Sequence, residues 1–146
     1  MNPSKRVGTA AETAVARYLA SRGITAHRAP LHGTQDRGDI WAAPTAHGYR
    51  VVVEVKAGAQ AHNPPMPQVE AWQQEAEAEA GRVADCDMAI LVLKRRGSAK
   101  VWDWPAYTKA GDIEFIVANY AGRTPLNDTW VCLPFGRLID LIEAAL

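Results

Sequence analysis

The segment that most constrains the fold is a run of valines that ends in two charged residues. Residues 50–57 read Arg-Val-Val-Val-Glu-Val-Lys-Ala, and such a β-branched run is typical of a central strand buried on both faces. Because residues i and i+2 of a strand point to the same face, Glu54 and Lys56 share one face while Val53 and Val55 share the other. A carboxylate and an amine there are costly unless they are paired or bind a metal. The alternative is an exposed Glu–Lys pair, and the apolar run favours a functional role.

A second acidic residue stands at the head of the preceding apolar run. Asp39 begins the predicted strand 39–43, which a short turn connects to the strand at 50–57 as a hairpin. The carboxylates of Asp39 and Glu54 suit a hard cation such as Mg²⁺, which takes oxygen ligands and keeps part of its water shell. Lys56 beside such an ion can position or deprotonate a water for attack on a phosphate. The three residues therefore indicate metal-assisted phosphodiester hydrolysis.

The spacing of these residues resembles that of a known nuclease superfamily. Asp39, followed on the next strand by Glu54-Val55-Lys56, is similar to the PD-(D/E)xK pattern, with Gly38 where many relatives have proline, a departure expected to move no ligand. The resemblance implies an α/β fold in which a mixed central β-sheet is flanked by helices, a restriction-endonuclease-like core. It also implies that Asp39, Glu54 and the main-chain carbonyl of Val55 hold Mg²⁺, for which Mn²⁺ can substitute, and that Lys56 is catalytic.

The residues that precede Asp39 make the resemblance more specific. Residues 5–12, Lys-Arg-Val-Gly-Thr-Ala-Ala-Glu, open a helix, Gly23-Ile24 follow it, and a polar loop precedes Asp39. This arrangement is similar to archaeal-type Holliday junction resolvases over residues 4–95. It implies a homodimer that cuts a four-way DNA junction at two symmetric places. From its length of 146 residues the chain is expected to be a single nuclease domain over residues 1–146. Two alternatives remain, another nuclease of the superfamily of restriction, nicking or repair type, and a catalytically silent DNA-binding module on the same fold.

Two further residues are candidates for the catalytic site. Glu12 borders the apolar face of a helix predicted over 5–21, where it is either a surface residue of the first turns or a third acid that reaches the metal. Gln68 opens a helix predicted over 68–81 and, with an aromatic residue four positions later, weakly resembles the Q-hxx-Y element of RecB-type members. It either orients Lys56 or a phosphate, or is an ordinary glutamine at a helix start. This helix is predicted to turn the following acidic residues away from its apolar face: Glu75, Glu77 and Glu79.

Basic residues supply the candidate contacts to DNA. The chain carries 16 basic and 16 acidic residues, so a basic face requires that the charges be separated in space. In the loop before Asp39, Thr34 offers the hydroxyl that touches the scissile phosphate in the resolvases, or is an ordinary turn residue, and Arg37 either contacts phosphate or is solvated. The remaining candidates are basic residues at both ends of predicted elements: Lys5, Arg6, Arg17, Arg22, Arg28, Lys94, Arg95 and Arg96.

The rest of the chain completes an α/β pattern. Further strands are predicted over 24–29, 87–94, 100–104, 113–118 and 129–133, with a loop or short helix over 105–111 and a helix over 135–146. Cys86 and Cys132 are expected to be reduced core residues. The N-terminal residues lack the apolar segment of a signal peptide, and no apolar run approaches eighteen residues, so a soluble cytoplasmic protein with no membrane partner is expected.

Overall fold

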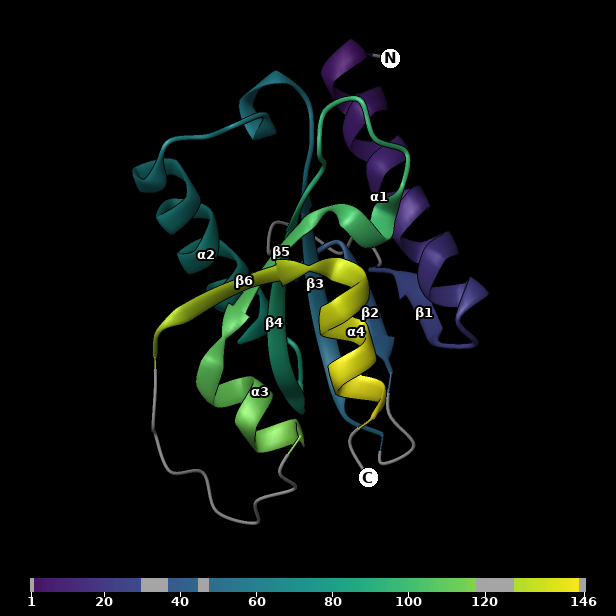
Figure 1. Cartoon of the computed structure of the whole chain (residues 1–146), viewed down its shortest axis with the longest axis vertical. Coiled ribbons are helices and arrows are strands. Elements are labelled where there is room, and N and C mark those ends of the chain that lie inside the picture. Colours follow the sequence, from purple (N-terminus) through teal and green to yellow (C-terminus); the bar gives the residue numbers. More distant parts are fainter. Residues whose placement is uncertain (1, 30–36, 45–47, 118–127, 145–146) are drawn as a thin grey trace.

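The computed structural model describes residues 2–29, 37–44, 48–117 and 128–144. In this part of the chain, helices pack on both faces of one mixed β-sheet, which confirms the predicted α/β class (Figure 1). The helices are α1 (Pro3–Ser21), α2 (Met66–Ala80), α3 (Ala110–Val117) and α4 (Phe135–Glu143), with short 3-10 turns η1 (Ala59–Ala61) and η2 (Val101–Asp103). The strands are β1 (Thr25–Arg28), β2 (Ile40–Ala43), β3 (Arg50–Lys56), β4 (Cys86–Leu93), β5 (Pro105–Lys109) and β6 (Trp130–Pro134).

The spatial order of the strands is the same as their order in the sequence, β1 to β6. All neighbouring strands are antiparallel except β3 and β4, which are parallel and are connected through α2. Since a parallel pair needs a crossover connection, α2 lies over the sheet and both β3 and β4 end at the same edge. This edge carries Lys56 and Lys94, whose backbones are joined by a hydrogen bond of 2.9 Å from Lys94 N to Lys56 O.

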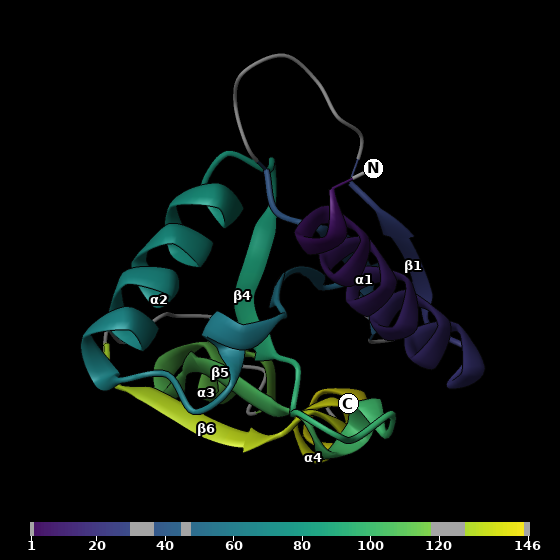
Figure 2. The same ribbon diagram turned by 90° about the horizontal axis from the view of Figure 1, so that it is seen from above.

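The helices divide unequally between the two faces. Helices α1, α3 and α4 cover one face through the largest hydrophobic cluster, which includes Val53 and Val55. Among the helices of the described ranges, α2 is the one that covers the other face, with Trp72 packed against Leu91 and Leu93 of β4. Figure 2 shows α2 on one side of β4 and α1 on the other. Because the valines of β3 alternate between these two layers, the strand is buried on both sides as its sequence predicts.

Most of the predicted elements are present with small shifts at their ends. Helix α2 begins two residues earlier than expected, because Pro67 occupies the first helical turn, where its missing N–H needs no partner. Both cysteines are free, but Cys132 is exposed, so its predicted place in the core is wrong. No helix within the described ranges has the length and apolar character needed to cross a membrane.

The segment after β4 differs from the prediction. Residues 100–104 form no strand, because Val101 and Trp104 both point into the core at a spacing of three residues, which suits the 3-10 turn η2. The strand that pairs with β4 is β5, in the segment predicted as a loop or short helix, and Ala106 and Thr108 alternate into its buried side. Proline is tolerated at the first residue of this strand.

Residues 113–118 were predicted as a strand, and those up to Val117 are helical instead. They belong to α3, and Ile113 and Ile116 lie one turn apart against the large core. Packing against the core therefore decides the structure of this segment, although its β-branched residues favour a strand. Intrinsic preferences for helix or strand are weak enough to be overridden in this way.

Candidate active site

Strand pairing brings Asp39 and Glu54 level with each other. In the β2–β3 ladder Ile40 pairs with Val53, and Asp39 immediately precedes Ile40 as Glu54 follows Val53. The backbone N–H of Asp39 donates to Val53 O at 3.2 Å, and the Asp39 carboxylate Oδ2 accepts a hydrogen bond from Val55 N at 2.8 Å. The predicted hairpin therefore fixes this aspartate against the strand that carries Glu54 and Lys56.

The backbone just before Asp39 requires glycine. Gly38 has φ of +82°, a region that side-chain-bearing residues rarely adopt. A Cβ at this position would lie 2.4 Å from Cγ1 of the buried Val52. Proline holds φ near −65°. The proline found at this position in many relatives of the resembled superfamily therefore cannot replace Gly38 without rearranging the approach to Asp39.

The two carboxyl groups of this hairpin are held in an unfavourable environment for charge. Burial, followed by the neighbouring Glu54, raises the pKa of Asp39 to about 8, although the hydrogen bond from Val55 opposes this shift. Burial, followed by contact with Glu79, raises the pKa of Glu54 to about 9. Only 5 % of Glu54 is exposed, so the alternative of an exposed Glu–Lys pair is wrong. Two buried carboxylates this close are stabilised by a proton or by a cation.

Helix α2 contributes two acids that the sequence prediction placed on its outer surface. Oxygen atoms of Glu54, Glu75 and Glu79 all lie within 4.8 Å of one another, and Glu79 is only 3 % exposed. The prediction that these glutamates point away from the apolar face is therefore wrong for Glu79, and Glu75 lies at the edge of the same face. A signal was present, because Gln68, Trp72, Glu75 and Glu79 follow the i, i+4, i+7, i+11 spacing of one helical stripe.

The ammonium group of Lys56 lies between strand and helix. Its Nζ is 3.2 Å from Glu54 Oε1 and 2.9 Å from Glu75 Oε1, and the side chain is only 17 % exposed. Burial lowers the pKa of Lys56, but the Glu54 and Glu75 carboxylates raise it by more, so the net pKa is above its ordinary value. Lys56 is therefore protonated at neutral pH, which suits it to donate hydrogen bonds and makes it a poor base.

Glu12 lies beside this cluster and is engaged by an arginine. Its carboxylate is 2.5 Å from Arg28 Nη2, which places it in an ion pair on the side of α1 that faces β1. Its negative charge nevertheless contributes to the raised pKa of Asp39. The structure therefore places Glu12 near the hairpin without joining it to the group formed by Glu54, Glu75 and Glu79.

Gln68 lies away from the lysine that it was predicted to orient. It is half-buried in the first turn of α2, and Glu75, on the same stripe, is about 10 Å further along the helix axis. Within the described ranges the Lys56 ammonium donates a hydrogen bond to Glu75. Glu75 is therefore the residue of α2 that holds Lys56 in this structure, and a role for Gln68 toward Lys56 or a phosphate stays a prediction.

Basic residues gather where β3 and β4 end. Lys94 and Arg96 line a cavity of about 380 Å³ together with His62 and Val7 of α1, so the first turns of α1 lie at the same edge. The walls between these side chains include two glycines and an alanine: Gly58, Ala59 and Gly97. The sequence did not single out His62, because an isolated loop histidine carries no pattern. Among the other candidates at this edge, Lys5, Arg6 and Arg95 are exposed.

The predicted basic face is smaller than expected. Arg22 is engaged by Asp140 at 2.8 Å and by Glu143, and Arg28 is engaged by Glu12, so neither is free to neutralise phosphates. Arg37 is half-buried, and its Nε is buried with no hydrogen-bond partner within the described ranges. Arg17 is exposed. Thr34 lies outside the described residues.

One observation indicates that these acidic residues suit a hard divalent cation. Glu54 Oε2 is buried and accepts no hydrogen bond from a donor among the described residues. A second carboxyl group, Asp39, lies near enough for Glu54 to raise its pKa, and a bound cation would favour the charged form of both. The Val55 N–H is taken by Asp39, which leaves its carbonyl as the ligand atom implied by the resemblance. Scans against protein-family models, curated proteins and solved structures found no match to the chain.

Proposed function

We propose that the protein is a Mg²⁺-dependent endonuclease that hydrolyses DNA phosphodiester bonds. The observation that carries the proposal is the placement of Asp39 beside Glu54 and Lys56 by the β2–β3 hairpin, with the Asp39 carboxylate held by Val55 N–H. The element order α1-β1-β2-β3-α2-β4, with β3 and β4 parallel, supports a restriction-endonuclease-like core. The basic cavity lined by Lys94 and Arg96 supports a phosphate backbone at the adjacent edge.

Asp39, Glu54 and the Val55 carbonyl would hold the Mg²⁺. When bound, the ion would polarise the phosphate and lower the pKa of a coordinated water. Lys56, as an ammonium, would donate a hydrogen bond to the developing negative charge on the phosphate, which is the part of the reaction that a protonated lysine performs well. To reach the phosphate it must exchange its partner Glu75 for the substrate.

The proposal is tested by cleavage of labelled DNA. Duplex, flap and four-way junction of equal length are incubated with the protein in Mg²⁺, in Mn²⁺ and in EDTA, beside the variant Asp39→Asn. Cleavage in either metal that is absent in EDTA and in the variant supports the proposal. The exposed Asp103, in the turn η2, supplies a matched control, since Asp103→Asn removes the same charge far from the hairpin in sequence. Equal cleavage by wild type and Asp39→Asn would refute the site assignment.

The same DNA substrates test which kind of nuclease the protein is. We propose a four-way junction as the preferred substrate, on the resemblance of residues 4–95 to the resolvases. A homodimer with one site per protomer would bind the junction more tightly than duplex and would nick it symmetrically, with an affinity that falls steeply with salt. A gel-filtration monomer that cuts duplex at fixed sequences would instead favour a restriction- or repair-type enzyme.

A further inference from the structure

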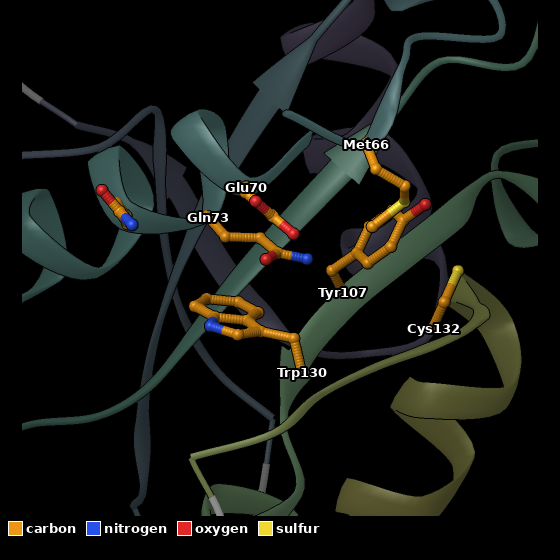
Figure 3. A pocket seen from close by; sticks show the side chains of 7 residues that line it. Met66, Glu70, Gln73, Tyr107, Trp130 and Cys132 are labelled. Atoms are coloured by element: carbon orange, nitrogen blue, oxygen red, sulfur yellow. The ribbon is translucent and has the colours of Figure 1, made fainter. Parts of the chain in front are cut away.

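A second cavity lies against the surface of α2 that faces β5 and β6. Its volume is about 400 Å³, within the range of small-molecule sites. Figure 3 shows the labelled side chains around the cavity, which come from three elements. The residues that line it are Met66, Glu70, Gln73 and Gln74 of α2, Tyr107 of β5, and Trp130 and Cys132 of β6.

One polar side chain that lines this cavity is largely buried. Gln73 is only 6 % exposed and contributes its side chain to the cavity wall. A side-chain amide carries both donors and an acceptor, so it can form hydrogen bonds with a ligand that contacts it. In Figure 3 the amide points into the cavity, between Trp130 and Tyr107. A ligand between these two rings can therefore form hydrogen bonds with the Gln73 amide.

The charge of the cavity excludes an anion. Glu70 is the one charged residue among the described residues that line it. The neighbouring cation, Lys109, pairs across the strands with Trp130 but is engaged by Glu77 at 2.5 Å and by Asp128 at 3.4 Å. A phosphate would therefore meet net negative charge, whereas a cation would find a carboxylate partner.

The two aromatic rings favour a flat group. Trp130 and Tyr107 are both half-buried and line the same cavity, so parts of their rings face the ligand. The Tyr107 hydroxyl is already hydrogen-bonded to the Cys132 thiol, which leaves the ring as the main contribution of this tyrosine. Met66, at the rim, is 58 % exposed, and its flexible thioether can adapt to an occupant.

We propose that this cavity binds a guanidinium group. A guanidinium is flat and cationic, stacks on aromatic faces, and carries five N–H donors for the Glu70 carboxylate and the Gln73 amide oxygen. A nucleobase would also stack on Trp130, but it leaves the charge of Glu70 unused. The group belongs either to a free guanidino compound or to an arginine side chain of a peptide. The inference is independent of nuclease activity.

Titration with L-argininamide, followed by calorimetry, tests the proposal on the full chain. Saturable binding is expected, and Glu70→Gln and Gln73→Met are each expected to weaken it by about tenfold or more, since each removes an acceptor for hydrogen bonds from a charged group. Glu114→Gln is the matched control, because Glu114 is an exposed glutamate of α3 outside the cavity, and it should bind as wild type does. Circular dichroism establishes that each variant is folded, and Glu70→Gln, at an exposed position, provides the test if Gln73→Met does not fold.

Two comparisons decide the chemistry of the ligand. Lysinamide carries the same charge without the flat fork, and adenosine is flat without the charge, so both should bind at least about tenfold more weakly than argininamide. A pentapeptide Gly-Gly-Arg-Gly-Gly that binds as tightly as argininamide would indicate a peptide source, and weaker binding would indicate a free compound. Absence of argininamide binding, equal binding of lysinamide, tighter binding of adenosine, or unchanged affinity in both variants would overturn the proposal.

Discussion

Lys56 donates a hydrogen bond to Glu75 across the gap between β3 and α2, with 2.9 Å from Nζ to Oε1. The contact ties the central lysine of the candidate site to a helix that the motif itself does not include. It also competes with any anion that approaches the same ammonium. In the proposed reaction Glu75 would therefore control how readily Lys56 is available to the phosphate.

Replacing Glu75 should remove the ion pair that holds the Lys56 ammonium against helix α2. In Glu75→Gln the pKa of Lys56 should fall, because one of the two carboxylates that raise it is lost. Nitrogen-15 NMR of the lysine side chains would follow this titration. Glu77→Gln is the matched control, since Glu77 belongs to the same helix but pairs with Lys109, whose pKa should fall instead. A Lys56 pKa unchanged in Glu75→Gln would contradict the assigned ion pair.

Removing the lysine should abolish most of the proposed activity. Lys56→Ala is expected to lower the rate of DNA cleavage by about 10²–10³, the usual effect of losing a donor to developing charge. Cleavage is measured in single-turnover assays over a range of Mg²⁺ concentrations. If high Mg²⁺ restores the rate, Lys56 serves only to adjust ion affinity.

The raised pKa values of Asp39 and Glu54 predict the pH dependence of stability. The pKa values in the folded protein keep protons on these groups up to about pH 8 and about pH 9, whereas the unfolded chain releases them near their ordinary pKa values of 3.8 and 4.5. Because the folded state binds more protons between these limits, the free energy of unfolding falls as pH rises from about 4 to 9. In EDTA the melting temperature should drop by about 5 °C or more from pH 5 to pH 9.

Two variants and added Mg²⁺ identify the groups that cause this pH dependence of stability. Asp39→Asn and Glu54→Gln remove a titrating carboxyl and should each flatten the dependence on pH. Added Mg²⁺ should raise the melting temperature most at high pH, where both carboxylates are charged and able to bind it. An equally steep slope in both variants would show that other groups dominate.

Gly38 should be intolerant of substitution for two separable reasons. Gly38→Ala places a Cβ 2.4 Å from Val52 Cγ1 and forces alanine to adopt φ of +82°. Gly48→Ala isolates the second effect, because Gly48 has φ of +75° but nothing within 4 Å of the added Cβ. Chemical denaturation should show a loss of about 1–3 kcal/mol for Gly38→Ala beyond that of Gly48→Ala. Equal losses would mean that Val52 moves aside without cost.

The parts of the fold that the sequence predicts well are those with one dominant signal. The valines of β3 admit few structures other than a buried strand, and the hairpin follows from the two apolar runs at 39–43 and 50–57 with a short turn between them. Residues 105–117 were misread because their β-branched and aromatic content is compatible with either element until the core is assembled. Partners distant in sequence were also missed, since nothing local to Glu79 indicates that Glu54 lies beneath it.

The ion pairs of Arg22 have a consequence for how the chain folds. Because each strand of the sheet adds beside the one before it, the chain can form strand pairs progressively from β1 onward. Arg22 in contrast joins the end of α1 to Asp140 and Glu143 in α4, 118 and 121 residues later. During synthesis from the N-terminus this clasp cannot form until α4 has been made, which is after the residues of the candidate site. The ion pairs of Arg22 therefore depend on a segment made well after the residues of the proposed chemistry.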